Sequence, residues 1–142
     1  MTNRTTPPSA HLSWRELACK DGTSYPLAWT ARARELAAAF EAVRRAAGDT
    51  PIAILSAYRT PEHNRRVGGA RNSQHVQGRA LDLRPPNGMT VDAFYRLIVG
   101  LARASVPSIR GIGKYKTFVH IDIRPGAHLA LWRGAGVKED TQ

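Results

Sequence analysis

The sequence predicts an α+β domain in which helices flank a small antiparallel sheet, and three observations favour this class. The length of 142 residues suits one domain of ordinary size that can bury a core. Apolar residues recur at helical spacing in two long segments, about 27–47 and 90–104. Short apolar runs bounded by turn residues are typical of strands, and such runs lie at 51–57, 79–84, 109–115 and 117–123.

The first part of the chain is expected to carry two helices before its first strand. Ser13 can cap a short helix through Cys19, and a Lys-Asp-Gly turn follows that helix. A long helix from about Leu27 to Ala47 ends at a glycine, and its apolar residues form a stripe that faces the core. The apolar run after this helix is predicted to be a buried strand.

Cap and turn residues place the remaining elements. Thr60 and Pro61 predict the start of a short helix, with Thr as its cap and Pro at the first helical position. The strand at 79–84 stops at a Pro-Pro-Asn-Gly turn, and Thr90 caps the helix that follows. The two remaining apolar runs then complete the sheet.

One domain is expected at 11–132, because no internal repeat and no long linker divides the chain. Residues 1–10 are predicted to form a flexible leader and residues 133–142 a flexible tail. The leader lacks the apolar core of a secretory signal, and no apolar run is long enough to cross a membrane. We therefore expect a monomer that is made in the cytoplasm and does not insert stably into membranes. Cys19 is the single cysteine, so an intrachain disulfide is excluded.

The chain is strongly basic. Lysine and arginine total 21 against 11 aspartate and glutamate residues, a formal net charge of +10. Such a surface favours polyanions, and nucleic acid, anionic lipid and a bacterial envelope all qualify. The basic residues are spread along the chain, so a solvated surface that keeps the protein soluble explains the charge equally well. No nucleic-acid-binding motif is present, and nucleic acid is not an expected partner.

Two histidines and one aspartate form the most informative pattern in the chain. Alternation along the strand at 117–123 places His120 and Asp122 on one face, while His75 directly precedes the strand that carries Asp82. Polar residues on the inner face of an apolar strand are costly unless a partner satisfies them, and a metal ion would do so. Two imidazoles and one carboxylate are a common ligand set of catalytic zinc. The pattern predicts Zn²⁺ held by His75, Asp82 and His120, and metal-assisted hydrolysis.

The residues around these ligands resemble the zinc D-alanyl-D-alanine carboxypeptidase family. The segment 73–82 reads Ser-x-His-x-x-Gly-x-Ala-x-Asp, and Phe-Val-His-Ile-Asp follows at 118–122. Further similarity lies in the segments 12–19, 56–64, 67–70 and 111–115. The family includes D-Ala-D-Ala dipeptidases and phage L-alanyl-D-glutamate endolysins, and it shares its fold with the hedgehog signalling domain. The resemblance covers roughly 12–124 and implies this fold and peptidoglycan peptide stems as the partner.

The resemblance also implies roles for individual residues. It makes His75, Asp82 and His120 the zinc ligands. Arg59 takes the place of the family arginine that steadies the oxyanion of the tetrahedral intermediate, which suits a fixed cation. Ser73 matches a residue near the substrate, although a serine that caps its own loop is almost as good an interpretation. From its place just before the strand that carries His120, Tyr115 is also expected to line the groove.

One position departs from the family pattern. Many relatives carry Glu or Asp as general base three residues before the last histidine ligand, and Thr117 stands there in this chain. Asp122, on the same strand face as His120, is the nearest replacement. Three roles stay open for it: a general base, an orienting partner of His120, or a metal ligand with His120 as the base.

Together these inferences predict a zinc metallopeptidase that cuts peptide-stem bonds next to D-amino acids. The predicted activity is that of a D,D-carboxypeptidase or endopeptidase, or that of an L-alanyl-D-glutamate endopeptidase. A small domain without a signal peptide fits a bacteriolytic phage endolysin that acts on the host cell wall. The missing acid also permits a catalytically inactive zinc-bearing module that binds the cell wall or serves a structural role. A basic nucleic-acid-binding domain would explain the charge but not the His/Asp pattern.

Overall fold

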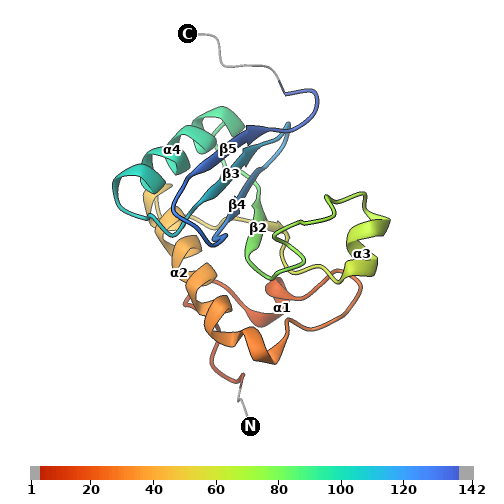
Figure 1. The fold of residues 1–142 in the computed structure, drawn as a ribbon. Coiled ribbons are helices and arrows are strands. Elements are labelled where there is room, and N and C mark those ends of the chain that lie inside the picture. Colours follow the sequence, from red (N-terminus) through yellow and green to blue (C-terminus); the bar gives the residue numbers. More distant parts are fainter. Residues whose placement is uncertain (1–3, 138–142) are drawn as a thin grey trace.

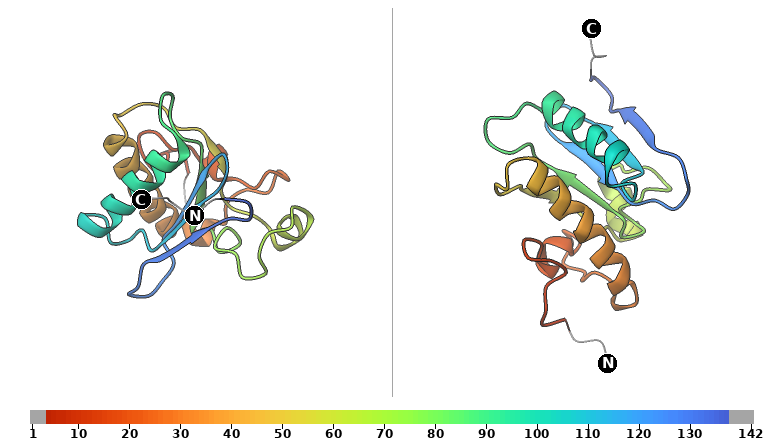
Figure 2. Two further views of the ribbon diagram at one scale, coloured as in Figure 1. Left: turned by 90° about the horizontal axis from the view of Figure 1, so that it is seen from above. Right: turned by 90° about the vertical axis from the view of Figure 1, so that its left-hand side faces the viewer.

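A five-stranded sheet with the order β1-β2-β4-β3-β5 forms the centre of the computed structural model, which describes residues 4–137 (Figure 1). Its strands are β1 (Ile54–Ser56), β2 (Ala80–Leu83), β3 (Gly111–Lys114), β4 (Val119–Asp122) and β5 (Ala130–Arg133). The helices are α1 (Trp14–Leu17), α2 (Thr30–Ala46), α3 (Pro61–Arg66) and α4 (Val91–Ala104), with a 3₁₀ turn η1 (Leu27–Trp29) before α2. Helices α2 and α4 cover one face of the sheet, and α3 lies apart from both (Figures 1 and 2).

The strand pairing confirms the predicted α+β class and corrects it at one edge. Antiparallel ladders join β1 to β2, β2 to β4 and β4 to β3. β5, which the sequence did not predict, pairs with β3 in parallel. β4 is therefore flanked on both sides, and Asp82 of β2 lies directly opposite His120 of β4.

Local signals start the helices where they were expected. The Ser13 hydroxyl accepts a hydrogen bond from the Glu16 amide, and the Glu16 carboxylate accepts one from the Ser13 amide, which completes a capping box on α1. The Thr60 and Thr90 hydroxyls cap α3 and α4 by accepting from the amide three residues further on. Within the described residues, none of these helices is long and apolar enough to cross a lipid bilayer.

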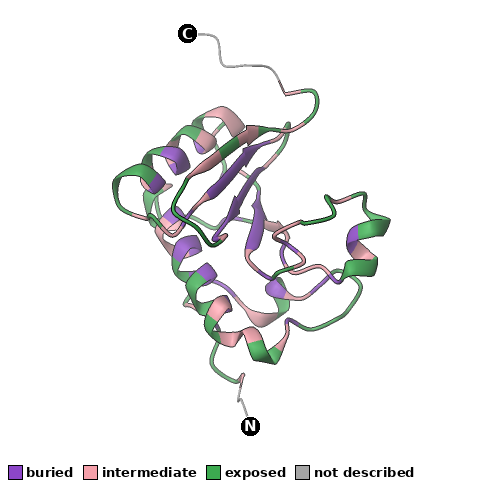
Figure 3. Cartoon of the chain, in the orientation of Figure 1, coloured by how far each residue is buried: buried purple, intermediate pink, exposed green. Residues whose placement is uncertain are grey.

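The core lies between the sheet and the two helices that cover it. Every residue of β2, β3 and β4 is buried (Figure 3). Buried apolar side chains of α2 and α4 complete this core, among them Leu36, Phe40, Phe94 and Ile98. Asp82, His120 and Asp122 are polar residues within the buried strands. Burial of polar groups costs free energy unless each of them has a partner, so each of these residues is expected to have one.

Residues 4–10, which were predicted to belong to a flexible leader, lie against the domain. The Arg4 guanidinium donates to the Tyr25 and Pro26 carbonyls at 2.5 and 2.6 Å and lies over the Trp14 ring. The Ser9 hydroxyl donates to Glu41 of α2 at 2.6 Å. The remaining residues of the predicted leader and the end of the predicted tail, 1–3 and 138–142, lie outside the described residues.

Candidate metal centre

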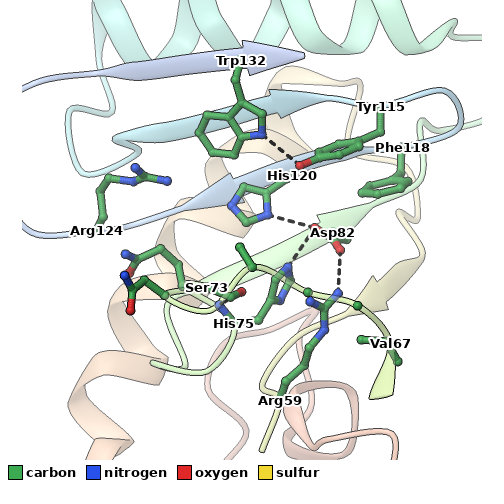
Figure 4. Close-up of a pocket in the computed structure, with 15 residues that line it drawn as sticks. Arg59, Val67, Ser73, His75, Asp82, Tyr115, Phe118, His120, Arg124 and Trp132 are labelled. Carbon is green, nitrogen blue, oxygen red and sulfur yellow. Dashed lines mark hydrogen bonds and ion pairs between the residues drawn. The ribbon is translucent and has the colours of Figure 1, made fainter. Parts of the chain in front are cut away.

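Three buried donors converge where β2, β4 and the turn before β2 meet. His75 lies in that turn, Asp82 on β2 and His120 on β4, and their exposed fractions are 3%, 6% and 7%. The cross-strand pairing of Asp82 with His120 places these two side chains on the same face of the sheet. Figure 4 shows His75 approaching the Asp82 carboxylate from the adjoining segment.

The donor atoms surround one point. His75 Nε2 lies 3.0 Å from Asp82 Oδ1, and His120 Nδ1 lies 3.1 Å from the same oxygen. One donor atom from each residue falls within 4.8 Å of the other two. The predicted trio of His75, Asp82 and His120 is thus brought together as a possible metal site, and each histidine would use a different ring nitrogen.

The hydrogen bonds of His75 show that a cation fits between the donors. Its Nδ1 lies 2.6 Å from the Ala57 carbonyl oxygen, which only accepts, so Nδ1 carries the proton. Burial lowers the pKa of His75 and favours the neutral ring. Nε2 then presents a lone pair to the Asp82 carboxylate oxygen, and two acceptors face each other at 3.0 Å. A bound cation would satisfy both acceptors.

Asp122 lies behind His120. His120 Nε2 donates to Asp122 Oδ2 at 2.8 Å, which leaves Nδ1 directed at Asp82. Burial by itself would lower the pKa of His120, but the contacts with Asp122 and Asp82 raise it overall. Arg124 donates to both oxygens of Asp122, from Nε at 2.8 Å and from Nη2 at 2.7 Å. The Asp122 carboxylate is fully buried, and it is not part of the donor group that His75, Asp82 and His120 form.

A cavity of about 440 Å³ opens over the trio, and Arg59 lies in its wall. Arg59 Nη2 lies 3.6 Å from Asp82 Oδ2, the carboxylate oxygen that faces away from the histidines. Ser56 and Asn64 accept hydrogen bonds from the same guanidinium at 3.2 Å each, which hold it beside the donors. Among the described residues, Asp82 is the one carboxylate in the cavity lining. Thr117 is exposed and does not line it.

Aromatic side chains form the opposite wall of the cavity. The Tyr115 and Phe118 rings are stacked with their centroids 4.6 Å apart. Trp132 of β5 donates from Nε1 to the Tyr115 hydroxyl at 2.9 Å, and its ring lies 5.1 Å from that of His120. Tyr115 therefore lines the cavity as expected. Ser73 also lines it, and its hydroxyl accepts from the His75 amide at 3.1 Å, so it caps its own loop as well.

Arg124, Phe118 and Trp132 line the cavity but were not among the site residues predicted from the sequence. Arg124 continues the alternation of His120 and Asp122, so extending the strand by one residue would have found it. Phe118 precedes this strand on the same alternation. Trp132 reaches the site through the parallel pairing of β5, for which the sequence carries no local signal.

Comparison with known proteins gives two matches. A family model described as "Peptidase M15" matches residues 10–122. The curated zinc D-Ala-D-Ala carboxypeptidase of Streptomyces albus G is 45% identical over 56 residues, which cover 38% of this chain. The matched segment spans 22% of the length of that relative.

Proposed function

Because this chain belongs to the peptidase M15 family, we propose that it is a zinc-dependent peptidase that cleaves peptidoglycan peptide stems next to D-amino acids. The observation that carries the proposal is the convergence of His75, Asp82 and His120 at the floor of a cavity large enough for a peptide segment. The similarity to a zinc D-Ala-D-Ala carboxypeptidase supports the choice of metal and of substrate. The candidate bonds are D-Ala-D-Ala, a D,D-crosslink and L-Ala-D-Glu.

The trio would hold the metal with His75 Nε2, Asp82 Oδ1 and His120 Nδ1, the atoms that face one another. Three protein donors leave a coordination position for water or substrate, as is typical of catalytic zinc. When bound, zinc supplies Lewis acidity, which lowers the pKa of water and polarises a carbonyl. The buried Ala57 carbonyl fixes the tautomer of His75 so that Nε2 stays available as a donor to the metal.

Arg59 supplies positive charge beside the metal site. Its contacts with Ser56, Asn64 and Asp82 fix the guanidinium before substrate arrives. A fixed cation in a shielded cavity stabilises negative charge that develops on the carbonyl oxygen of the scissile bond. We assign Arg59 this role, in agreement with its place in the family motif.

We assign Asp122 the orienting role among the three that the sequence left open. Its carboxylate accepts the Nε2 proton of His120 and thereby keeps Nδ1 free for the metal. Arg124 neutralises the buried carboxylate and holds both of its oxygens. A general base must reach the water that attacks the substrate, and Asp122 lies behind the histidine rather than in the cavity lining.

We place the activity at the bacterial cell wall, in the manner of a phage endolysin. The net charge of +10 supports this setting, because a basic surface is attracted to an anionic envelope. One observation favours a second candidate, a zinc-bearing module without activity: within residues 4–137 no carboxylate besides Asp82 lines the cavity.

Digestion of purified peptidoglycan tests the proposal. The zinc-loaded protein should release fragments with new amino or carboxyl termini, and mass spectrometry of the muropeptides would identify the bond. A His120→Asn variant serves as the matched control, because it removes one proposed ligand. A known cell-wall peptidase assayed in parallel serves as the positive control. If this control releases new termini and the protein binds peptidoglycan without releasing any, the protein is an inactive module rather than a peptidase.

A further inference from the structure

A second group of metal-ligand side chains lies outside the cavity, at the loop that follows α1. Cys19, Asp21 and His63 each offer one donor atom within 4.8 Å of the other two. Cys19 and Asp21 come from this loop, and His63 comes from α3. The loop and α3 are joined directly, since the Thr60 hydroxyl that caps α3 donates to Asp21 Oδ2 at 2.9 Å. None of the three residues belongs to the cavity lining.

Each donor is in a state that suits a metal. Cys19 is 4% exposed, so its sulfur is shielded from bulk solvent. Asp21 Oδ1 accepts from the Thr23 amide at 2.9 Å, and the hydrogen bonds to this carboxylate, with that of Thr23 the largest, lower the pKa of Asp21. The His63 ring makes no hydrogen bond or ion pair with any of residues 4–137, so its nitrogens are available.

We propose that Cys19, Asp21 and His63 form a second metal site for a thiophilic divalent cation such as Zn²⁺. Thiolate, carboxylate and imidazole are all zinc ligands, and this combination of donor types favours zinc over magnesium or calcium. On binding, the Cys19 thiol releases its proton to solvent and forms a sulfur–metal bond. Asp21 and His63 are partly open to solvent, so a water molecule completes the tetrahedral coordination.

One positive charge lies near the site without closing it. Arg66 Nη2 is 3.9 Å from Asp21 Oδ2, and the Arg66 side chain is 66% exposed. An exposed ion pair of this length contributes little free energy. The arginine can therefore move into solvent when a cation binds to the carboxylate.

The second site would connect the N-terminal loop to the wall of the catalytic cavity. It fixes α3, and Asn64 of α3 accepts a hydrogen bond from Arg59 at 3.2 Å and donates one to the Ala70 carbonyl at 2.9 Å. Ala70 and Arg59 both line the cavity. We therefore assign the second metal a structural role, distinct from the chemistry of the trio.

Cobalt substitution of the full-length protein tests this site separately from the first. A cobalt–thiolate bond gives a near-ultraviolet charge-transfer band, and Cys19 is the single cysteine of the chain, so the band reports on the second site alone. Wild-type protein stripped with a chelator and titrated with Co²⁺ should show the band and bind two ions per chain. His120→Asn, which damages the trio, should keep the band.

Variants decide whether all three donors take part. Cys19→Ser and His63→Asn should each lose the band and bind one ion fewer, whereas His128→Asn, at an exposed histidine outside both groups, should match wild type. His63 is only partly buried, so its variant guards against a folding defect in Cys19→Ser. One ion per chain without a thiolate band in wild type, or a band that survives in His63→Asn, would overturn the proposed site. Neither outcome depends on peptidase activity.

Discussion

At the scale of single residues, the two nitrogens of His120 explain how the candidate site is organised. One nitrogen faces Asp82 and the other donates to Asp122, so the ring lies between a carboxylate of the trio and a carboxylate behind it. Hydrogen bonds to the outer nitrogen of a histidine ligand fix its tautomer and increase its basicity. We therefore propose that Asp122 acts by supporting metal binding at His120.

The Asp122→Asn variant separates the orienting role from that of a base. Loss of the charged acceptor should weaken zinc binding by about 10- to 100-fold, while turnover at saturating zinc falls much less. Competition with a chromogenic chelator gives the affinity, and kcat is measured with zinc in excess. Unchanged zinc affinity with a collapse of kcat would identify Asp122 as the base instead.

The Arg59→Lys variant tests the proposed stabilisation of negative charge. Lysine keeps the charge but not the fork that Ser56 and Asn64 hold, so kcat should fall by about 10²–10³-fold. The zinc content should stay at the wild-type level, which metal analysis of the purified variant would check. A wild-type kcat in this variant would contradict the catalytic role of Arg59, whose contact with Asp82 would then be its remaining function at the site.

The sequence indicated the proposed trio because two of its members are close in sequence and strand alternation fixes the face of the third. His75 and Asp82 are separated by one turn and half a strand, and alternation fixes the face of His120. The role of Asp122 could not be predicted in the same way. Its carboxylate could face the substrate or the ring of His120. Only the folded structure shows that Arg124 holds both oxygens beside His120.

At the scale of elements, neighbouring side chains leave no room for side chains on the face of β3 that carries Gly111 and Gly113. A Cβ at Gly111 would overlap the Asp122 carboxylate, and one at Gly113 would overlap the Trp132 indole. Gly111 lies opposite Asp122 in the β3–β4 ladder, and Gly113 lies opposite His120. The glycines of β3 thus make space for the groups that surround His120.

The Gly111→Ala variant should affect the metal centre without changing any polar residue. The added methyl group would displace Asp122, lower the free energy of unfolding by about 1–3 kcal/mol and weaken zinc binding. Chemical denaturation and zinc competition measure the two effects. Gly100→Ala on α4 is the matched control: it meets open space and should raise stability by about 0.5–1 kcal/mol. Wild-type zinc affinity in Gly111→Ala would contradict the orienting role.

The attachment of the N-terminal segment to α2 should depend on pH through Glu41. Burial by itself would raise the pKa of Glu41, but hydrogen bonds from Ser9 and His11 lower it overall. Its stabilising effect is therefore present above the ordinary glutamate pKa of about 4.3 and disappears as pH falls through the lower folded value. Glu41→Gln should cost about 1–2 kcal/mol at neutral pH.

Denaturation of wild type and Glu41→Gln across the acid range measures this difference. The two stability curves should converge at low pH, because a protonated glutamate resembles glutamine. A difference that stays constant down to the acid limit would show that the carboxylate charge does not contribute.

The elements themselves were predictable to different degrees. Helices α3 and α4 start at the predicted caps because a hydroxyl that accepts a hydrogen bond three residues on is a local signal. β5 was missed because only half of its residues are partly buried and its partner is a parallel strand remote in sequence. Residues 4–10 have no periodic pattern, and contacts with α2 and the loop before it position them.

At the scale of the whole molecule, each metal ion would join segments that are far apart in the sequence. The trio joins β2, β4 and the turn before β2, and the proposed second site joins α3 to the loop after α1. A ligand that binds only the folded state stabilises it by mass action.

Chelation should lower the thermal stability of the protein. In a Cys19→Ser background, which isolates the trio, removing zinc from about 100 times its Kd should cost about 2.7 kcal/mol. For a chain of this size the midpoint of unfolding then falls by roughly 5–10 °C. Scanning calorimetry with and without chelator measures the shift, and Asp82→Asn should not respond. An equal shift in both proteins would mean that the chelator acts elsewhere.

The central position of β2 and β4 also bears on how such a protein can diverge. Asp82 and His120 lie in the middle of the sheet, whereas the cavity rim comes from the segment 67–74, the turn at 115–118 and the edge strand β5. Surface loops accept substitutions and insertions more readily than buried strands do. Substitutions in the rim are therefore expected to change the substrate preference without disturbing the proposed metal ligands on the buried strands.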